Sequence, residues 1–119
     1  MIEIDLALDE AGVLMACGVQ GHAGAGPKGR DVVCAAVSVL TKTALGVLAV
    51  QEGIRVQGAA ERGLWRMETE YTPEGRGFLF AIGVFLKEGL EAVSQEYPDQ
   101  CRITITTKRR GLYGSKAGR

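Results

Sequence analysis

The stretch that decides the fold is DVVCAAVSVLTKTALGVLAVQ, residues 31–51. Apolar side chains fall on nearly every side of a helix built from it, so we predict a central and mostly buried helix. Asp31 is a good N-cap, because its carboxylate can accept the unpaired amides of the first turn. Gly53 suits the end of this helix. The apolar positions expected to pack are Val32, Val33, Ala36, Val37, Leu40, Ala44, Leu45 and Leu48.

Strands are predicted on both sides of this helix. Residues 2–8 alternate between apolar and polar side chains, which indicates a strand with one buried face. After a turn at 9–12, residues 13–19 return as the second strand of a hairpin. Beyond the helix, residues 54–58 form a short strand and residues 65–71 alternate again. The side chains of the first strand expected to point away from the core are Glu3, Asp5, Ala7 and Asp9.

A second helix and one more strand complete the pattern. Residues 72–75 contain a proline and a glycine and break the preceding strand, and residues 78–96 then show helical periodicity. Residues 101–107 form the last strand. The order ββαββαβ predicts an α+β domain, with two helices packed on a mainly antiparallel sheet. The apolar side of the second helix comprises Phe78, Ile82, Phe85, Leu86, Leu90 and Val93.

Length and charge indicate one ordinary globular domain. The chain has 119 residues, and we place a single α+β domain at residues 1–107. Residues 108–119 carry five basic side chains and no acidic side chain, and are predicted to form a flexible basic tail. Basic and acidic residues balance at 14 each, so no global field draws the protein to nucleic acid. No stretch is long and glycine-free enough to span a membrane, so we expect a cytoplasmic protein.

The cysteines argue against a disulfide scaffold and against a metal site. The chain has three cysteines, Cys17, Cys34 and Cys101, which is an odd number. They are widely spaced and form no CxxC pair, which suits a reducing compartment. The chain has a single histidine, and no ligands fall at zinc spacing, so we expect neither a metal nor another cofactor. Cys17 and Cys101 lie in predicted strands and are expected to be core residues.

Cys34 and His22 are the two side chains best suited to chemistry. With Asp31 as N-cap, Cys34 lies in the first helical turn, where amides and the helix dipole favour a thiolate and could stabilise an oxyanion. The carboxylate of Asp31 works partly against a second negative charge. His22 precedes a glycine-rich loop that could fold back, which would let it act as the base for Cys34. Ser38 and Thr41 share the helix face of Cys34.

Other interpretations remain open from the residues alone. A cysteine in an apolar helix is often a small buried hydrophobe. The glycine-rich loop could hold a phosphate ahead of the helix, although it matches neither the Walker motif nor GxGxxG. A thiol sensor would need a resolving cysteine, and none is obvious in the sequence. The main alternative to an enzyme is a non-catalytic ribosome- or RNA-associated binding module that uses the basic tail.

Two segments, GHAG at residues 21–24 and DVVCAAVS at residues 31–38, resemble the signature of the bacterial ribosomal-processing cysteine proteases called Prp. The resemblance extends along the chain in length and in the order of elements. It implies a homodimeric endopeptidase with a Cys–His dyad, here Cys34 and His22. It also implies a substrate, the N-terminal extension of the large-subunit ribosomal protein whose tail reaches the peptidyl-transferase centre, cut after an aromatic residue.

The same resemblance implies supporting roles around the dyad. Gly21, Gly24 and Gly29 match glycines that act as hinges of a loop admitting the peptide, and Asp31 and Ser38 also match the motif. The loop centre, AGPK at residues 25–28, departs from the family pattern because it has no aromatic side chain and adds a proline and a positive charge. We therefore interpret the chain as a thiol protease of ribosome biogenesis that acts on a ribosomal protein precursor and requires neither nucleic acid nor a membrane.

Overall fold

The structure is a computed structural model that describes residues 1–21, 31–61 and 63–110. Five strands and two helices follow one another in the order ββαββαβ, which confirms the predicted α+β class. The third strand is three residues longer than the predicted range of 54–58, and the second helix begins two residues earlier than predicted. The elements are β1 (Ile2–Asp9), β2 (Leu14–Gln20), α1 (Val32–Ala49), β3 (Ile54–Glu61), β4 (Leu64–Tyr71), α2 (Arg76–Glu96) and β5 (Cys101–Lys108).

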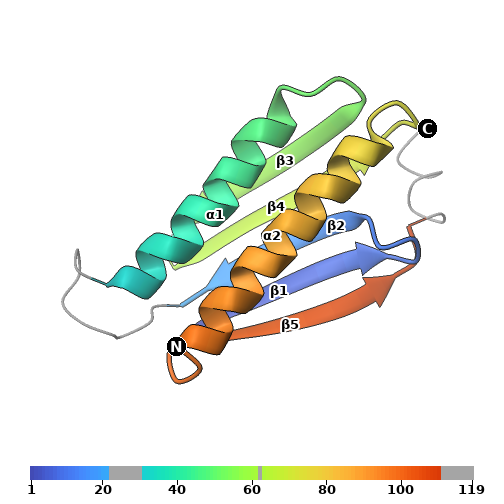
Figure 1. The fold of residues 1–119 in the computed structure, drawn as a ribbon. Helices are drawn as coiled ribbons and strands as arrows, with labels where there is room; N and C mark the ends of the chain where they lie inside the picture. The colour runs from blue at the N-terminus through green and yellow to red at the C-terminus, as the bar shows by residue number, and fades with distance from the viewer. Residues whose placement is uncertain (22–30, 62, 111–119) are drawn as a thin grey trace.

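The strands form one sheet with the order β3-β4-β2-β1-β5. Three of its pairings are antiparallel, and β1 pairs with β5 in parallel. A parallel pair needs a crossover connection, and α2 provides it on the way from β4 to β5. Both helices lie side by side over one face of the sheet and leave the other face uncovered (Figure 1). The molecule is therefore a two-layer sandwich, and the core lies between the layers.

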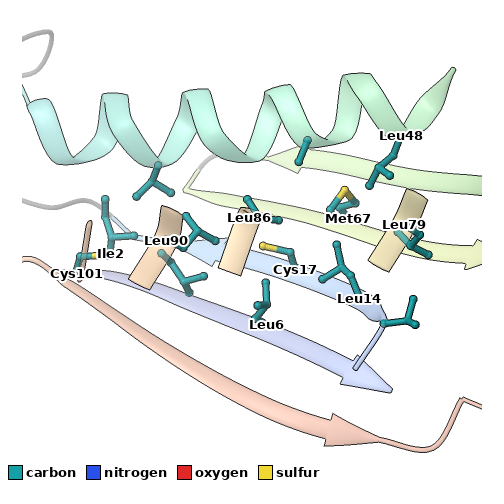
Figure 2. Close-up of a cluster of buried hydrophobic side chains, with 14 of the residues drawn as sticks. Ile2, Leu6, Leu14, Cys17, Leu48, Met67, Leu79, Leu86, Leu90 and Cys101 are labelled. Carbon is teal, nitrogen blue, oxygen red and sulfur yellow. The ribbon is translucent and has the colours of Figure 1, made fainter. Parts of the chain in front are cut away.

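The core is built from the inward side chains of the sheet and one stripe of each helix (Figure 2). Leu6, Leu48, Met67, Leu79 and Leu86 have no exposed surface. Full burial of one such side chain stabilises the fold by about 1.5–3 kcal/mol. The two strand cysteines are buried in the same cluster, which confirms their prediction as core residues.

The prediction that the central helix is mostly buried is wrong for its outer side. Val32, predicted to pack, is 56% exposed, and Val39 and Val50 are 64% and 84% exposed. On α2, Phe85 was predicted on the apolar side and is 65% exposed. The reason is the two-layer architecture, in which no described element covers the helices from outside. By length and a mean hydropathy of 2.0, α1 could also cross a membrane, a test that core helices pass as well.

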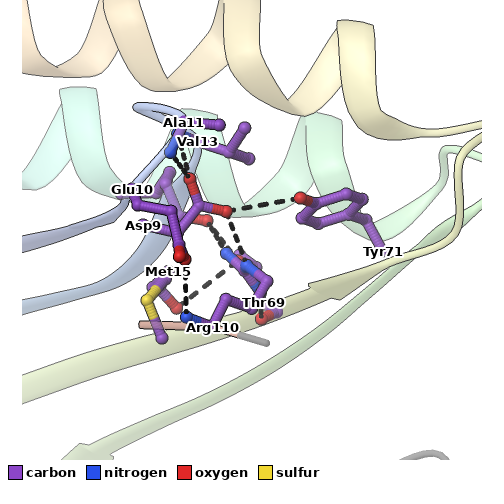
Figure 3. Close-up of polar contacts among 9 residues, drawn as sticks. Asp9, Glu10, Ala11, Val13, Met15, Thr69, Tyr71 and Arg110 are labelled. Atoms are coloured by element: carbon purple, nitrogen blue, oxygen red, sulfur yellow. Dashed lines mark hydrogen bonds and ion pairs between the residues drawn. The ribbon is translucent and has the colours of Figure 1, made fainter. Parts of the chain in front are cut away.

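A buried polar cluster lies at the β1–β2 turn, at one end of the sheet (Figure 3). Asp9, predicted to face solvent, is 3% exposed, because it lies past a register shift between Ala7 and Leu8. One of its carboxylate oxygens accepts the amides of Ala11 and Val13, both at 2.9 Å. The other accepts the guanidinium Nε of Arg110 at 3.0 Å.

Arg110 ties the end of the described chain to three strands. Its Nη atoms donate to the carbonyls of Thr69, at 2.8 Å, and Leu14, at 2.6 Å, and its guanidinium lies 4.7 Å from the centre of the Tyr71 ring. Within the predicted tail of residues 108–119, Lys108 ends β5 and Arg110 is bound to the domain. Residues 111–119 lie outside the described residues, so their flexibility stays a prediction.

The pKa of Asp9 makes this cluster sensitive to acid. Burial raises that pKa, but the hydrogen bonds from Val13, Arg110 and Ala11 and the charge of Arg110 together lower it below its ordinary value of 3.8. A carboxyl with a lowered pKa stabilises the fold above the unfolded value, and this contribution is lost as the pH falls through the folded value.

We expect Arg110→Gln to lower the free energy of unfolding by roughly 2 kcal/mol at pH 7, since it leaves a buried carboxylate without its cation. The difference from wild type should be smaller at about pH 2.5, because the contribution of the carboxylate is lost as the pH falls through the lowered pKa of the folded protein. Urea unfolding at both pH values measures it, with the neighbouring exposed Arg109→Gln as the control. An equal loss at both pH values would show that the ion pair is not the cause.

Candidate active site

Cys34 lies in the first turn of α1, at the position that the sequence predicts. The N-cap is Asp31, with φ −79° and ψ 101°, as expected. Its Oδ1 accepts the amides of Val33 at 3.0 Å and Cys34 at 3.1 Å. Capping by an aspartate typically contributes about 1 kcal/mol to helix stability. This cap therefore fixes both the start of α1 and the place of the cysteine on it.

The second oxygen of the same carboxylate reaches the thiol. Cys34 Sγ donates a hydrogen bond to Asp31 Oδ2 at 3.2 Å. One side chain thus holds the backbone of the first turn with one oxygen and orients the sulfur with the other. From the sequence, we predict that the Asp31 carboxylate works partly against a second negative charge. The contact gives the reason, because a carboxylate beside the sulfur favours the protonated thiol over the thiolate.

The amides of the first turn are less available for an oxyanion than the sequence suggests. Those of Val33 and Cys34 are taken by the Asp31 side chain, and that of Ala35 donates to the Asp31 carbonyl at 3.1 Å. The positive end of the helix dipole still favours an anion beside this turn. An oxyanion bound by these amides would have to displace the capping carboxylate.

Cys34 faces a pocket of about 300 Å³ between α1 and the β3–β4 turn. The thiol is half-buried, and Ser38 and Thr41 lie with it on the same side of the helix. The polar stripe predicted on α1 is therefore part of the pocket wall. The full lining is Ile2, Val19, Gly21, Cys34, Val37, Ser38, Thr41, Lys42, Ala60, Glu61, Gly63, Leu64 and Trp65.

The predicted loop glycines are only partly within the described residues. Gly21 lines the pocket and has a φ of 93°, a left-handed conformation that favours glycine. A Cβ there would overlap the carbonyl of Met1, and the Gly21 amide donates to the carbonyl of Gly63 at 2.9 Å. Gly21 is thus held where the chain leaves β2. His22, Gly24, Gly29 and the loop centre at 25–28 lie outside the described residues, so their roles stay predictions.

Several pocket residues are absent from the sequence prediction. Trp65 reaches the pocket because β4 pairs with β2, which sets Trp65 opposite Val19. Glu61 and Leu64 come from the adjoining ends of β3 and β4. Lys42 lies two turns along α1 from Cys34. The only sequence signal for these positions is the alternation of residues 65–71. It predicts a strand, but it does not tell which strand lies beside Cys34.

The environments of the other two thiols differ from that of Cys34. Burial, with a smaller contribution from the charge of Asp5, raises the pKa of Cys17 to about 12. Burial also raises the pKa of Cys101, and the charge of Cys34 adds to the effect. The charge of Cys34 therefore reaches Cys101, although 66 positions separate the two residues in the sequence. Among residues 1–21, 31–61 and 63–110, no cluster of three metal-binding side chains occurs.

Alkylation of the folded protein should therefore be selective. We expect iodoacetamide at pH 7 to modify Cys34 at least tenfold faster than Cys17 or Cys101, because buried thiols with raised pKa values are inert. Peptide mapping by mass spectrometry gives the three rates, and unfolding in urea should make them similar. Equal rates in the folded protein would contradict the assignment of Cys34 as the reactive thiol.

Comparison with known proteins finds a matching family and similar solved structures. A family model described as cysteine protease Prp matches residues 1–102. A crystal structure of the essential ribosomal processing protease Prp from S. aureus, with a covalently linked product peptide, is similar to this fold with a TM-score of 0.76 and 20% identity. The match covers 88% of this chain and 99% of that one.

Other solved structures show the same fold. The Streptococcus mutans protein SMU.848 has a TM-score of 0.77 and 21% identity, over 91% of this chain and 99% of its own. The S. aureus protease with a substrate peptide has a TM-score of 0.72 and 19% identity, over 88% of this chain and 99% of its own. No curated protein matches the sequence. At these identities the structural likeness establishes the shared fold.

Proposed function

The chain belongs to the cysteine protease Prp family, and on that premise we propose that it is the endopeptidase that removes the N-terminal extension of a large-subunit ribosomal protein. The substrate is the ribosomal protein whose tail reaches the peptidyl-transferase centre. Cys34 is the nucleophile and His22 the base. The observation that carries this proposal is the position of Cys34, a half-buried thiol in the first turn of α1 that opens onto a pocket.

The chemistry is acyl transfer through a thioester. His22 takes the proton of the Cys34 thiol, and Sγ attacks the carbonyl carbon of the scissile bond. The proton then passes to the leaving amine, and water hydrolyses the thioester to release the carboxylic acid. Asp31 holds Sγ in place before the attack through the 3.2 Å hydrogen bond. The negative charge of Asp31 also favours the protonated form of a histidine base that approaches the thiol.

The pocket beside the thiol suits one large side chain of the substrate. Its volume of about 300 Å³ has apolar walls from Val19, Leu64 and Trp65. A pocket of this kind accommodates an aromatic ring, which gains from burial and from edge or face contacts with the indole. This supports a cut next to an aromatic residue.

A homodimer is the second part of the proposal, formed in the cytoplasm through the outer helix face. This face comprises Val39 and Val47 of α1, Val50 just past its end, and Val84 and Phe85 of α2, all exposed. Over the 18 residues of α1 the face is about 27 Å long, and two adjacent helices make it about 20 Å wide. The flat area of this face is about 540 Å², about two thirds of the roughly 800 Å² that each partner buries in a standard interface.

We expect a peptide that spans the extension and the mature N-terminus of the ribosomal protein to be cut once, after an aromatic residue. Cys34→Ala and His22→Ala should each lower the rate by at least a hundredfold, because each removes one member of the dyad. Mass spectrometry of the products gives the position of the cut. Thermal unfolding of the variants confirms their fold. Cleavage that persists in folded Cys34→Ala would refute the assignment.

The wild-type protein should sediment at twice its chain mass of 12.7 kDa. Phe85→Glu should sediment as the monomer, since a buried charge without a partner at the centre of an apolar interface is costly. Thr104→Glu, on the uncovered face of the sheet, is the matched control and should stay dimeric. A monomeric wild type at micromolar concentration would contradict the dimer, and a dimeric Phe85→Glu would contradict this interface.

A further inference from the structure

We propose that the substrate peptide binds as an added strand along the outer edge of β3, which guides it to Cys34. This inference rests on the proposed function and gives the site its mode of peptide recognition. The partner it fits is an extended peptide of several residues without structure of its own. Such a segment can present its backbone to a sheet edge, whereas a helix cannot.

The edge of β3 is open for pairing. β3 is the terminal strand of the sheet and pairs with β4 over all eight of its residues, from Ile54 opposite Tyr71 to Glu61 opposite Leu64. No described strand pairs with its other side. In such a strand, alternate residues direct their N–H and C=O groups outward, where a second chain can bind them.

β3 carries Arg55 near its start and Glu61 at its end, but the residues between 57 and 61 leave this part of the edge unprotected. Natural edge strands are commonly blocked by lysine, proline or a bulge. The register of β3 with β4 is regular throughout, and its last half contains the small residues Gly58, Ala59 and Ala60. The opposite edge, β5, carries Arg102 and Lys108 and β-branched residues between them. Of the two edges, β3 is the one that admits close approach of another backbone.

The β3 edge runs directly into the site. Ala60 and Glu61, its last residues, line the same pocket as Cys34. The strand of eight residues is about 25 Å long, enough to hold a peptide of seven or eight residues. A peptide paired along β3 would therefore be led by its backbone to the pocket that holds the thiol.

Helix α1 supplies a wall above this edge. It lies over β3 (Figure 1). Leu45 of α1 approaches Gly58 so closely that a Cβ at Gly58 would meet the Leu45 side chain at 3.2 Å. Lys42 of α1 and Glu61 of β3 stand on the two sides of the pocket. One set of alternate side chains of a paired peptide would face α1, and the other would face the uncovered side of the sheet. Sequence selectivity would come from the first set.

A backbone N-methyl scan of the cleaved peptide tests this binding mode. Each residue of the six before the cut is N-methylated in turn, in the peptide used to establish cleavage. We expect kcat/KM to fall about three- to tenfold at every second position, where an amide bonded to β3 is lost, and to change little between them. Losses without a period of two, or no losses, would overturn the proposal.

Two variants of the protein give an independent readout. Ala59→Pro and Ala60→Pro remove consecutive amides, of which one points to β4 and the other outward. Proline at an outward position of an edge strand is tolerated, so one variant should keep the wild-type thermal unfolding. We expect that variant to lose at least fivefold in kcat/KM and to keep the rate of Cys34 alkylation. An unchanged kcat/KM in the folded variant would also overturn the proposal.

The outcomes separate this inference from the proposed function. If the unmodified peptide is not cut by the wild-type protein, the proposed function fails, and strand addition of a substrate fails with it. If the peptide is cut but neither the scan nor the proline variant shows the expected loss, only strand addition is wrong.

Discussion

The site depends on one carboxylate. Asp31 caps α1 through the amides of Val33 and Cys34 and holds the Cys34 thiol at 3.2 Å with its other oxygen. The cap lies where the chain enters the helix, so the same interaction that starts the helix also aims the sulfur. The rest of the molecule keeps this turn in place, because Val33 and Val37 anchor the first half of α1 in the core. Helix capping and the placement of the Cys34 thiol are therefore one feature of this fold.

The two-layer architecture explains why chemistry and recognition lie where they do. Both helices cover one face of the sheet, which leaves apolar side chains on their outer side and exposes both sheet edges. The pocket forms where α1 meets the end of the β3–β4 hairpin, so residues as far apart in the sequence as Ile2 and Trp65 line it together. At the opposite end of the sheet, far from this pocket, Arg110 and Asp9 form an ion pair. One end of the domain is thus fixed by an ion pair, and the other end holds the pocket beside Cys34.

Much of the fold could be predicted from the sequence, because alternation along β1 and β4 and the helical pattern of α1 and α2 are local signals. The N-cap Asp31, the position of Cys34 and its shared face with Ser38 follow from local rules as well. Burial depends instead on what lies above each element, so Val39 and Phe85 could not be placed without knowing that the fold has two layers. The pairings that bring Trp65 to the pocket, Cys101 near Cys34 and Arg110 to Asp9 are non-local, and no spacing rule reveals them.

The central claim is that Cys34 carries the acyl group during turnover. The most direct measurement is to quench the reaction of protein and peptide with acid within milliseconds to seconds and to locate the acyl adduct by mass spectrometry. The account predicts one thioester, on the tryptic peptide of residues 31–42, that disappears in Cys34→Ala. An adduct on Cys17 or Cys101, or cleavage with no thioester when water attack is rate-limiting, would contradict it.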